Sequence, residues 1–184
     1  MVRAGECRFE RDMCGWSNGT DKGSASWRLA TATRRPANLA DKTFGAPDGY
    51  VYYDLFNQIL GSNMVRLISP LIPASEDTQL CLSFWYAAFG AGDSALMQVM
   101  RQDNGSSNND LEKIWSLEAK NMDTTRPLWM PAQVTVESGT NFHIILEGQA
   151  TNGGFAVDDI TFTPGVCPTR PDKAEIKSQE IKSP

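Results

Sequence analysis

The chain has 184 residues and a net charge of −5, with 41% hydrophobic and 21% charged residues. This length suffices for one substantial hydrophobic core, and the composition is that of an ordinary soluble globular protein. No run approaches the roughly 18 apolar residues of a membrane-spanning helix, and Lys and Arg form no cluster. These features argue against membrane insertion, an anionic membrane surface or nucleic acid as the main partner. The first residues lack the apolar stretch of a signal peptide, so we expect a piece of a larger protein.

Short runs with the alternation typical of β-strands follow one another along the chain, separated by clusters of Gly, Pro, Asn and Ser. In chain order the expected strands are 50–53, 65–69, 80–86, 95–100, 133–136, 142–147 and 155–162. Residues 111–119 fit a strand or a brief helical turn equally well. The regular spacing predicts an all-β antiparallel sandwich or barrel.

The sequence changes character after Cys167. Between Asp172 and Pro184 only Ala174, Ile176 and Ile181 are apolar. So little apolar surface cannot offset the entropy of ordering the segment. We therefore expect residues 168–184 to form a flexible linker or an expression-derived tail, and residues 1–6 to form a short lead-in.

Four cysteines, at positions 7, 14, 81 and 167, indicate disulfides rather than a metal site. Their spacings fit no zinc-finger pattern, and the single histidine, His143, is too few for an ordinary Cys/His zinc site. Four thiols allow three pairings, of which the nested one, Cys7–Cys14 with Cys81–Cys167, is the simplest. The spacing leaves all three pairings open, together with four reduced cysteines in a cytosolic protein.

A set of residues runs through the chain in a specific order and spacing. It comprises Cys7-Arg8-Phe9-Glu10, Cys14-Gly15-Trp16, Trp27, Asp41-Lys42-Thr43, Gly49-Tyr50, Leu67-Ile68-Ser69-Pro70, Cys81-Leu82-Ser83-Phe84-Trp85-Tyr86, Trp115, Trp129, Phe142, Glu147, Gly154-Phe155-Ala156-Val157-Asp158-Asp159-Ile160 and Cys167. This set resembles a MAM domain, the extracellular module of meprins, neuropilins and receptor tyrosine phosphatases of the mu type. The resemblance covers residues 7–167. It departs from the family at Lys42, where members often have His.

The resemblance implies a two-sheet antiparallel jelly-roll β-sandwich over residues 7–167. It also implies the disulfides Cys7–Cys14 and Cys81–Cys167, and an extracellular location in a cell-surface receptor or a secreted multidomain protein. Members of the family serve in adhesion, receptor dimerisation and ligand presentation, and none is known as a catalyst through this module.

The candidate catalytic residues also argue against an enzyme. Ser/His/Asp chemistry needs a histidine beside a nucleophile. His143 occupies an alternating position of an expected strand, where we expect a partly exposed structural residue. Asp158 and Asp159 are adjacent in an expected strand, so their side chains point to opposite faces. They cannot share one substrate as a glycosidase pair does.

Carboxylates suit a structural cation better, because Ca²⁺ takes six to eight oxygen ligands. Glu10 lies in the first strand region and Asp158 in the last, and such strands often pair in sandwiches. Asp12 and Asp41 lie in loops that can reach the same place. Some jelly-roll relatives, MAM domains among them, look to carry a cation here, so we predict a Ca²⁺ site formed by these four residues. The alternative is a set of hydrogen-bonded carboxylates, with Glu10 paired to an Arg and Asp158 accepting backbone N–H groups.

Two Asn-x-Ser/Thr sequons begin at Asn18 and Asn104, both in polar, glycine-containing stretches. We expect at least one of them to be glycosylated in the native protein.

Most of the aromatic residues are expected to fill the core. We expect Phe44, Phe56 and Phe89, in or beside loops, to be exposed and able to anchor a partner. The apolar run from Leu55 to Leu60 is the first candidate for an interface.

Together these observations predict a non-catalytic extracellular interaction module that contacts a protein ligand or a second copy of itself. One alternative is a glycan-binding jelly roll, supported by fold analogy alone. The other is an oligomerisation domain of a secreted protease.

Overall fold

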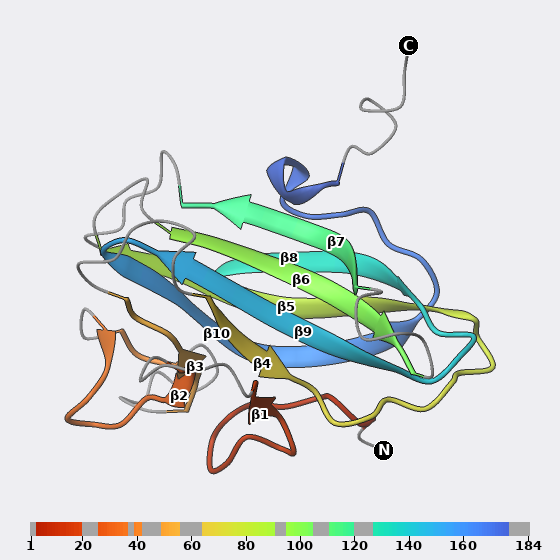
Figure 1. The fold of residues 1–184 in the computed structure, drawn as a ribbon, viewed down its shortest axis with the longest axis horizontal. Coiled ribbons are helices and arrows are strands. Elements are labelled where there is room, and N and C mark those ends of the chain that lie inside the picture. The colour runs from red at the N-terminus through yellow and green to blue at the C-terminus, as the bar shows by residue number, and fades with distance from the viewer. Residues whose placement is uncertain are drawn as a thin grey trace.

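The computed structural model describes residues 3–19, 26–36, 39–41, 49–55, 64–90, 95–104, 111–119 and 127–176. Within these residues the fold is a sandwich of two five-stranded antiparallel sheets (Figure 1). The first sheet has the order β1-β4-β9-β6-β7, formed by Ser17–Asn18, Val65–Ile68, Phe142–Ala150, Ala95–Asp103 and Leu111–Glu118. The second has the order β2-β3-β10-β5-β8, formed by Arg28–Leu29, Val51–Tyr52, Gly153–Pro164, Gln79–Gly90 and Met130–Glu137.

The expected all-β, two-sheet jelly-roll sandwich is confirmed, and each of the seven expected strands is present. The ambiguous stretch 111–119 is the strand β7 because it pairs with β6 over most of its length. Strand β8 includes Pro131, which is tolerated because β8 lies at the edge of its sheet. The two-residue strands β1 and β2 were not predicted, since they are too short to show a period.

The main core lies between the two sheets and is dominated by aromatic rings. Trp115 of β7 is fully buried and packs edge-on against Phe84 and Tyr86 of β5, with ring centroids 5.1 and 5.8 Å apart. Tyr86 also packs against Phe155 of β10, at 6.2 Å. Such tilted and edge-to-face pairs add to the hydrophobic stabilisation from burial. These contacts tie the first sheet to the second.

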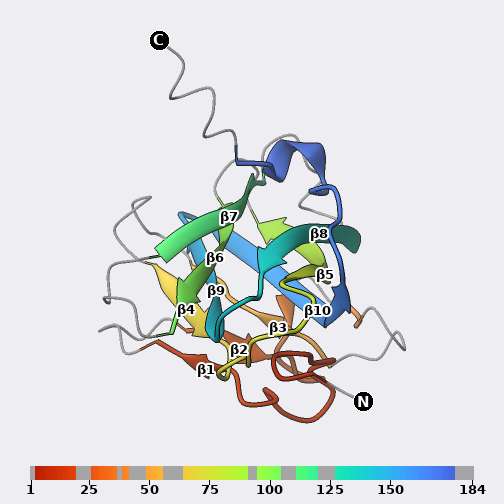
Figure 2. The same ribbon diagram turned by 90° about the vertical axis from the view of Figure 1, so that its right-hand side faces the viewer.

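A second apolar cluster covers the outer face of the second sheet. Its members come from the sheet and from the segment that follows β2, and they are Ala30, Leu39, Tyr50, Tyr52, Ala87, Phe89 and Ala156, with Trp129 packed against them. Figure 2 shows the two layers side by side, with β7, β6, β9 and β4 in one and β8, β5 and β10 in the other. The chain therefore lays an additional layer of side chains over one outer face.

Both disulfides have the pairing that the family resemblance implied. Cys7 is bonded to Cys14 across a short loop, with the two Cα atoms 5.8 Å apart. Cys81 of β5 is bonded to Cys167, which follows β10, with the Cα atoms 5.6 Å apart. Every cysteine is paired, so the reduced alternative is wrong.

The segment 165–176, here called the C-terminal strap, packs onto the edges of both sheets (Figure 2). Gln133 of β8 and Arg170 exchange two backbone hydrogen bonds of 3.1 and 2.9 Å. The indole N–H of Trp115, in the other sheet, donates to the Arg170 carbonyl at 2.9 Å. Ala174 is fully buried in a 3₁₀ turn.

The expectation of a flexible segment is therefore wrong for residues 168–176, and residues 177–184 lie outside the described part of the chain. Composition misled because it measures only the segment's own apolar side chains. The strap is held instead by main-chain hydrogen bonds and by the Cys167 tether.

Truncating the strap tests its contribution to stability. We expect a chain that ends at Thr169 to lose about 2–4 kcal/mol of unfolding free energy relative to one that ends at Ile176. The loss comes from three hydrogen bonds and the buried Ala174. Urea unfolding of the two chains measures it, and equal midpoints would show that the strap is not part of the folding unit.

No helix within the described ranges is long and apolar enough to cross a membrane.

Candidate functional site

The first element of the candidate site is the disulfide loop that carries Glu10. Cys7 pairs with Ile160 of β10 through two backbone hydrogen bonds of 3.1 and 2.9 Å, which attach the loop to the last strand. Phe9 has a left-handed backbone, with φ of 52°, and its side chain is buried. Buried Phe9 and the bond from Cys7 to Cys14 anchor the loop around Glu10. The expected meeting of the first and last strand regions is thus confirmed.

The second element is a bulge in β10 at Asp158. The register between β10 and β5 shifts between Asp158 and Thr161, and Asp159 has a left-handed φ of 52°. A bulge of this kind redirects side chains and interrupts regular pairing. Asp158 is fully buried, and its Oδ1 accepts a hydrogen bond of 2.8 Å from the Asp159 N–H. The opposite cross-strand partner of Asp158 is Trp85 of β5.

The third element is the segment 39–41, which is held over the sheet by two aromatic donors. The Tyr50 hydroxyl donates to the Leu39 carbonyl at 2.7 Å, and the Trp129 indole N–H donates to the Ala40 carbonyl at 2.7 Å. The two rings meet edge-on with centroids 5.4 Å apart. Asp41, the next residue, is 3% exposed. The segment therefore delivers a carboxylate to the outer face of the second sheet.

These three elements bring Glu10, Asp41 and Asp158 together. One carboxylate oxygen from each lies within 4.8 Å of the others. Gly49 lines the same place: a Cβ atom there would lie 2.8 Å from Glu10 Oε2 and 3.1 Å from Asp41 Oδ2. Gly49 also has a φ of +97°, a backbone conformation that residues other than glycine rarely adopt. A residue without a side chain is therefore needed beside the carboxylate cluster.

Asp12 does not belong to this cluster, so the four-residue prediction is corrected to three. Its Oδ1 accepts a hydrogen bond of 2.9 Å from the Cys14 N–H, which keeps it at the exposed end of the disulfide loop. A second cluster of possible metal ligands consists of Asp12, Cys7 and Cys14, whose ligand atoms also lie within 4.8 Å of one another. It offers no thiolate ligands because the two sulfurs are bonded to each other.

The donor set is of the kind that a hard divalent cation takes. Carboxylate oxygens are the ligands of Ca²⁺, and three converging carboxylates repel one another unless a positive charge lies between or near them. The negative field reaches Tyr50. Burial is the main cause that raises the pKa of Tyr50, and the charges of Asp158 and Asp41 raise it further, whereas Arg35 lowers it. The tyrosine stays protonated and keeps donating to Leu39.

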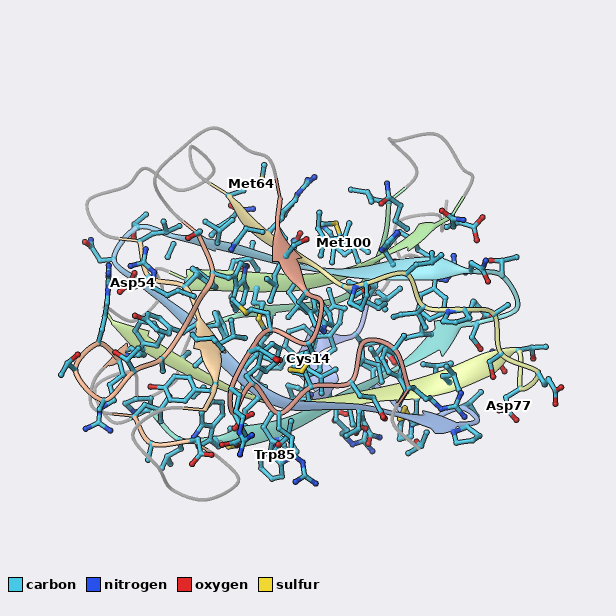
Figure 3. The ribbon with its side chains drawn as sticks, turned by 90° about the horizontal axis from the view of Figure 1, so that it is seen from below. Cys14, Asp54, Met64, Asp77, Trp85 and Met100 are labelled. Carbon is cyan, nitrogen blue, oxygen red and sulfur yellow. A yellow bond between two sulfur atoms is a disulfide. The ribbon has the colours of Figure 1, made fainter. Side chains whose placement is uncertain are left out.

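The place of this cluster follows from Trp85, which Figure 3 labels. Trp85, the cross-strand partner of Asp158, lies on one outer face, and Met100 of β6 lies on the opposite one. Asp54 and Asp77 mark the two ends. The cluster is thus on the outer face of the second sheet, away from the core between the sheets. Trp85 is only half-buried there.

The interface predictions fare less well. Leu55 is 3% exposed and exchanges two backbone hydrogen bonds of 2.8 Å with Gly153, and Phe89 is 4% exposed and packs against Tyr52. The expectation that these two residues offer an exposed contact is wrong. The additional layer of side chains over the second sheet buries Phe89. The sequence near Phe89 does not reveal that layer, because most of its other members come from distant segments. Phe44 and Phe56 lie outside the described residues.

The remaining predicted residues have structural surroundings. His143 is half-buried on β9, and its Nδ1 lies 2.9 Å from the Ser69 carbonyl oxygen, as expected for a structural histidine. Asn18 and Asn104 are both exposed. The sequence indicated no role for Gly49, Tyr50 or Trp129. All three belong to the family pattern, and only the contacts show that they surround or position Asp41.

Comparison with known proteins identifies the class of module. A family model described as "MAM domain, meprin/A5/mu" matches residues 7–168. The chain belongs to the MAM family. Its two disulfides and its relatives, one of them named as a glycosylphosphatidylinositol anchor protein, mark it as an extracellular interaction module.

Its similar proteins are larger than this chain. Thyroid hormone-induced protein B of Xenopus laevis is 30% identical over 89% of the chain and 23% of its own length. Meprin A subunit alpha of Rattus norvegicus is 29% identical, with shares of 89% and 22%. MAM domain-containing glycosylphosphatidylinositol anchor protein 1 of Gallus gallus is 29% identical, with shares of 90% and 18%. The chain thus spans about a fifth of the length of these relatives.

Solved structures show the same fold at low identity. A cleaved adhesin domain of Lys-gingipain from Porphyromonas gingivalis aligns with a TM-score of 0.65 at 16% identity, covering 87% of this chain and 97% of that one. A xylan-binding domain from Paenibacillus barcinonensis aligns with a TM-score of 0.54 at 10% identity, covering 91% and 100%. At these identities the likeness concerns the fold alone.

Proposed function

We propose that this MAM domain is a non-catalytic module that binds a protein partner, either another extracellular protein or a second copy of itself, in adhesion or receptor dimerisation. The observation that carries the proposal is the outer face of the second sheet. There a disulfide loop, the 39–41 segment and the β10 bulge are held together beside the half-buried Trp85. This arrangement presents a preorganised surface, which lowers the entropy cost of binding.

The surroundings of two polar side chains, His143 and Arg101, support binding over catalysis. His143 is engaged by a main-chain carbonyl, and the buried Arg101 holds the β8–β9 turn through the Glu137 carbonyl, at 2.7 Å, and Thr140. These side chains serve the fold. A reaction would need a nucleophile and base directed at a common point.

The second candidate is a glycan-binding module, and Trp85 is the observation that favours it. Trp85 is a half-buried aromatic residue on an outer sheet face, and aromatic side chains are large apolar groups of the kind that contact sugar rings. The third candidate, an oligomerisation domain of a larger secreted protease, has support in the similarity to meprin A subunit alpha.

Sedimentation velocity over a wide range of protein concentration, alongside a glycan array, separates these candidates. Concentration-dependent dimers without glycan hits are expected. Glycan hits on a strictly monomeric protein, lost on Trp85→Ala, would overturn the proposal in favour of the second candidate. A monomer without glycan hits contradicts self-association and leaves a different protein as the partner.

We also propose that Glu10, Asp41 and Asp158 hold a structural Ca²⁺. At millimolar calcium, an extracellular site of ordinary affinity stabilises a domain by about 1 kcal/mol, which raises Tm by about 2–4 °C. We expect this rise in calcium relative to chelator, and its loss in Asp158→Asn and Glu10→Gln. Gly49→Ala is also expected to abolish it, because the added methyl group meets two of the carboxylates.

Asp12→Asn is the matched control for the calcium experiment. It removes one carboxylate close in sequence to Glu10 but outside the cluster, and the amide oxygen can still accept from the Cys14 N–H. We expect this variant to keep the rise of Tm in calcium. Equal melting temperatures of the unsubstituted protein in calcium and in chelator, with no ion in its native mass spectrum, would end the proposal.

A further inference from the structure

The two sequons differ sharply in what the structure does with their asparagines. The Asn18 carboxamide makes a two-point contact with the backbone of one residue: its Nδ2 donates to the Trp27 carbonyl at 3.0 Å, and its Oδ1 accepts from the Trp27 N–H at 2.8 Å. Asn18 belongs to β1 in the first sheet, and Trp27 directly precedes β2 in the second. This side chain therefore links the two sheets at their β1/β2 edges.

The residue that Asn18 holds is itself a link between the sheets. Trp27 is 1% exposed, and its indole N–H donates to the Val65 carbonyl in β4 of the first sheet at 3.2 Å. Its ring packs edge-on against Tyr53, with centroids 4.8 Å apart. The Asn18 amide satisfies both backbone polar groups of this buried residue, which the short edge strands leave without a ladder partner.

An N-linked sugar conflicts with this contact for a stereochemical reason. Glycosylation replaces one hydrogen of Nδ2 by the sugar C1 and makes a secondary amide, whose trans form is favoured by more than an order of magnitude in population. In that form C1 lies on the same side as Oδ1. Oδ1 and one Nδ2 hydrogen of Asn18 both contact the backbone of Trp27. That hydrogen must therefore be the one on the same side of the amide as Oδ1. The sugar and the Trp27 carbonyl therefore compete for one position.

Asn104 has the opposite surroundings. It follows β6 and is exposed, and its backbone N–H donates to the Asn141 carbonyl at 2.9 Å. Arg101 and Thr140 hold Asp103, the last residue of β6, through its carboxylate. Within the described residues the Asn104 carboxamide has no hydrogen bond. The backbone of Asn104 is thus anchored, and the residue is exposed.

From this contrast we infer that Asn104 carries the N-linked oligosaccharide of this domain, whereas Asn18 stays unmodified and acts as a clamp between the sheets. Asn104 lies near the end of the sandwich marked by Asp77 in Figure 3, because Asn141, which bonds its backbone, also accepts from the Ala74 N–H. The oligosaccharide then extends into solvent from the end opposite Asp54.

Mapping the modified asparagine in secreted protein tests this inference. The chain is expressed in mammalian cells behind a secretion signal, and the purified protein is treated with peptide:N-glycosidase F in heavy-oxygen water before peptide mapping. This enzyme converts a glycosylated Asn to labelled Asp. We expect label at position 104 and unlabelled Asn at position 18. Label at 18 overturns the clamp, and absence of label at 104 overturns the acceptor.

Sequon variants separate the sugar from the side chain. Thr20→Ala removes the first sequon and leaves the Asn18 amide in place, so we expect an unchanged mass, yield and Tm. Ser106→Ala removes the second and should cost the mass of one oligosaccharide. A mass loss in Thr20→Ala contradicts the inference.

The clamp is tested where no glycosylation occurs, in protein refolded from bacteria. Asn18→Asp places an acceptor against the Trp27 carbonyl, so we expect its Tm to fall by several degrees. An unchanged Tm in Asn18→Asp overturns the structural role independently of any sugar.

Discussion

Replacing Cys81 and Cys167 by alanine is expected to lower the unfolding free energy of this domain by about 4–5 kcal/mol and its Tm by roughly 10–15 °C. The bond closes a loop with a sequence separation of 86, so its loss returns much conformational entropy to the unfolded chain. It also removes the covalent tether between β5 and the C-terminal strap, which then keeps only its non-covalent contacts, such as those of Cys167 with Thr135 of β8 and of Arg170 with Trp115 of β7. Urea unfolding under non-reducing conditions measures the change.

The short disulfide provides the comparison. Cys7 and Cys14 are separated by 7 residues, and the same chain-entropy estimate gives about 2.4 kcal/mol for the double alanine variant. This second variant also frees the loop that carries Glu10, so we expect the calcium response to disappear with it. Equal losses for the two double variants would contradict the dependence on loop length and point to strain or residual structure in the unfolded state.

Trp115→Ala is expected to cost about 3–5 kcal/mol, because it opens a cavity at the centre of the core. The ring is fully buried and contacts both Phe84 and Tyr86 of the other sheet. The substitution also removes the donor to the Arg170 carbonyl. Both effects loosen the join between the sheets at the β7/β8 edges, and calorimetry or urea unfolding reports their sum.

Trp115→Phe is the control that divides this cost. Phenylalanine keeps much of the aromatic packing but lacks the indole N–H, so it leaves the Arg170 carbonyl without this donor at a cost of about 1–2 kcal/mol beyond the lost volume. Applied to a chain that ends at Thr169, the same substitution has a smaller effect, since the acceptor is already gone. If Trp115→Phe costs the same in both chains, the indole does not hold the strap.

The carboxylate cluster and the Asn18 clamp have a common origin in the short N-terminal segments. Among the described residues of this region, 7–19, 26–36 and 39–41, the contributions to the sheets are β1, β2 and an isolated bridge at Cys7, so these segments gain few ladder hydrogen bonds. They are attached instead by a disulfide and by side-chain hydrogen bonds to the backbone. We therefore expect this region to respond most strongly to calcium and to substitutions at single side chains.

Local pattern alone was enough for the seven expected strands, the all-β class and the position of His143 on a strand. Alternation of apolar and polar residues is a property of neighbouring positions, and Val65–Ile68 or Phe142–Ala150 show it without reference to distant residues. The family pattern added the disulfide pairing and the pair Glu10 and Asp158. Neither spacing nor composition distinguishes one pairing of four cysteines from another.

Contacts between distant residues decided the rest. Asp41 joins the cluster because Tyr50 and the distant Trp129 hold residues 39–41 over the sheet. Asp12 does not, because its carboxylate accepts from the Cys14 N–H at the exposed end of the disulfide loop. Phe89 is buried, and the strap is ordered, because each is covered or bonded by elements that no local window contains. The two sequons look alike as tripeptides, yet only the fold puts Trp27 against one of them. Burial and hydrogen bonding are pairwise properties, so they appear only when the chain is folded.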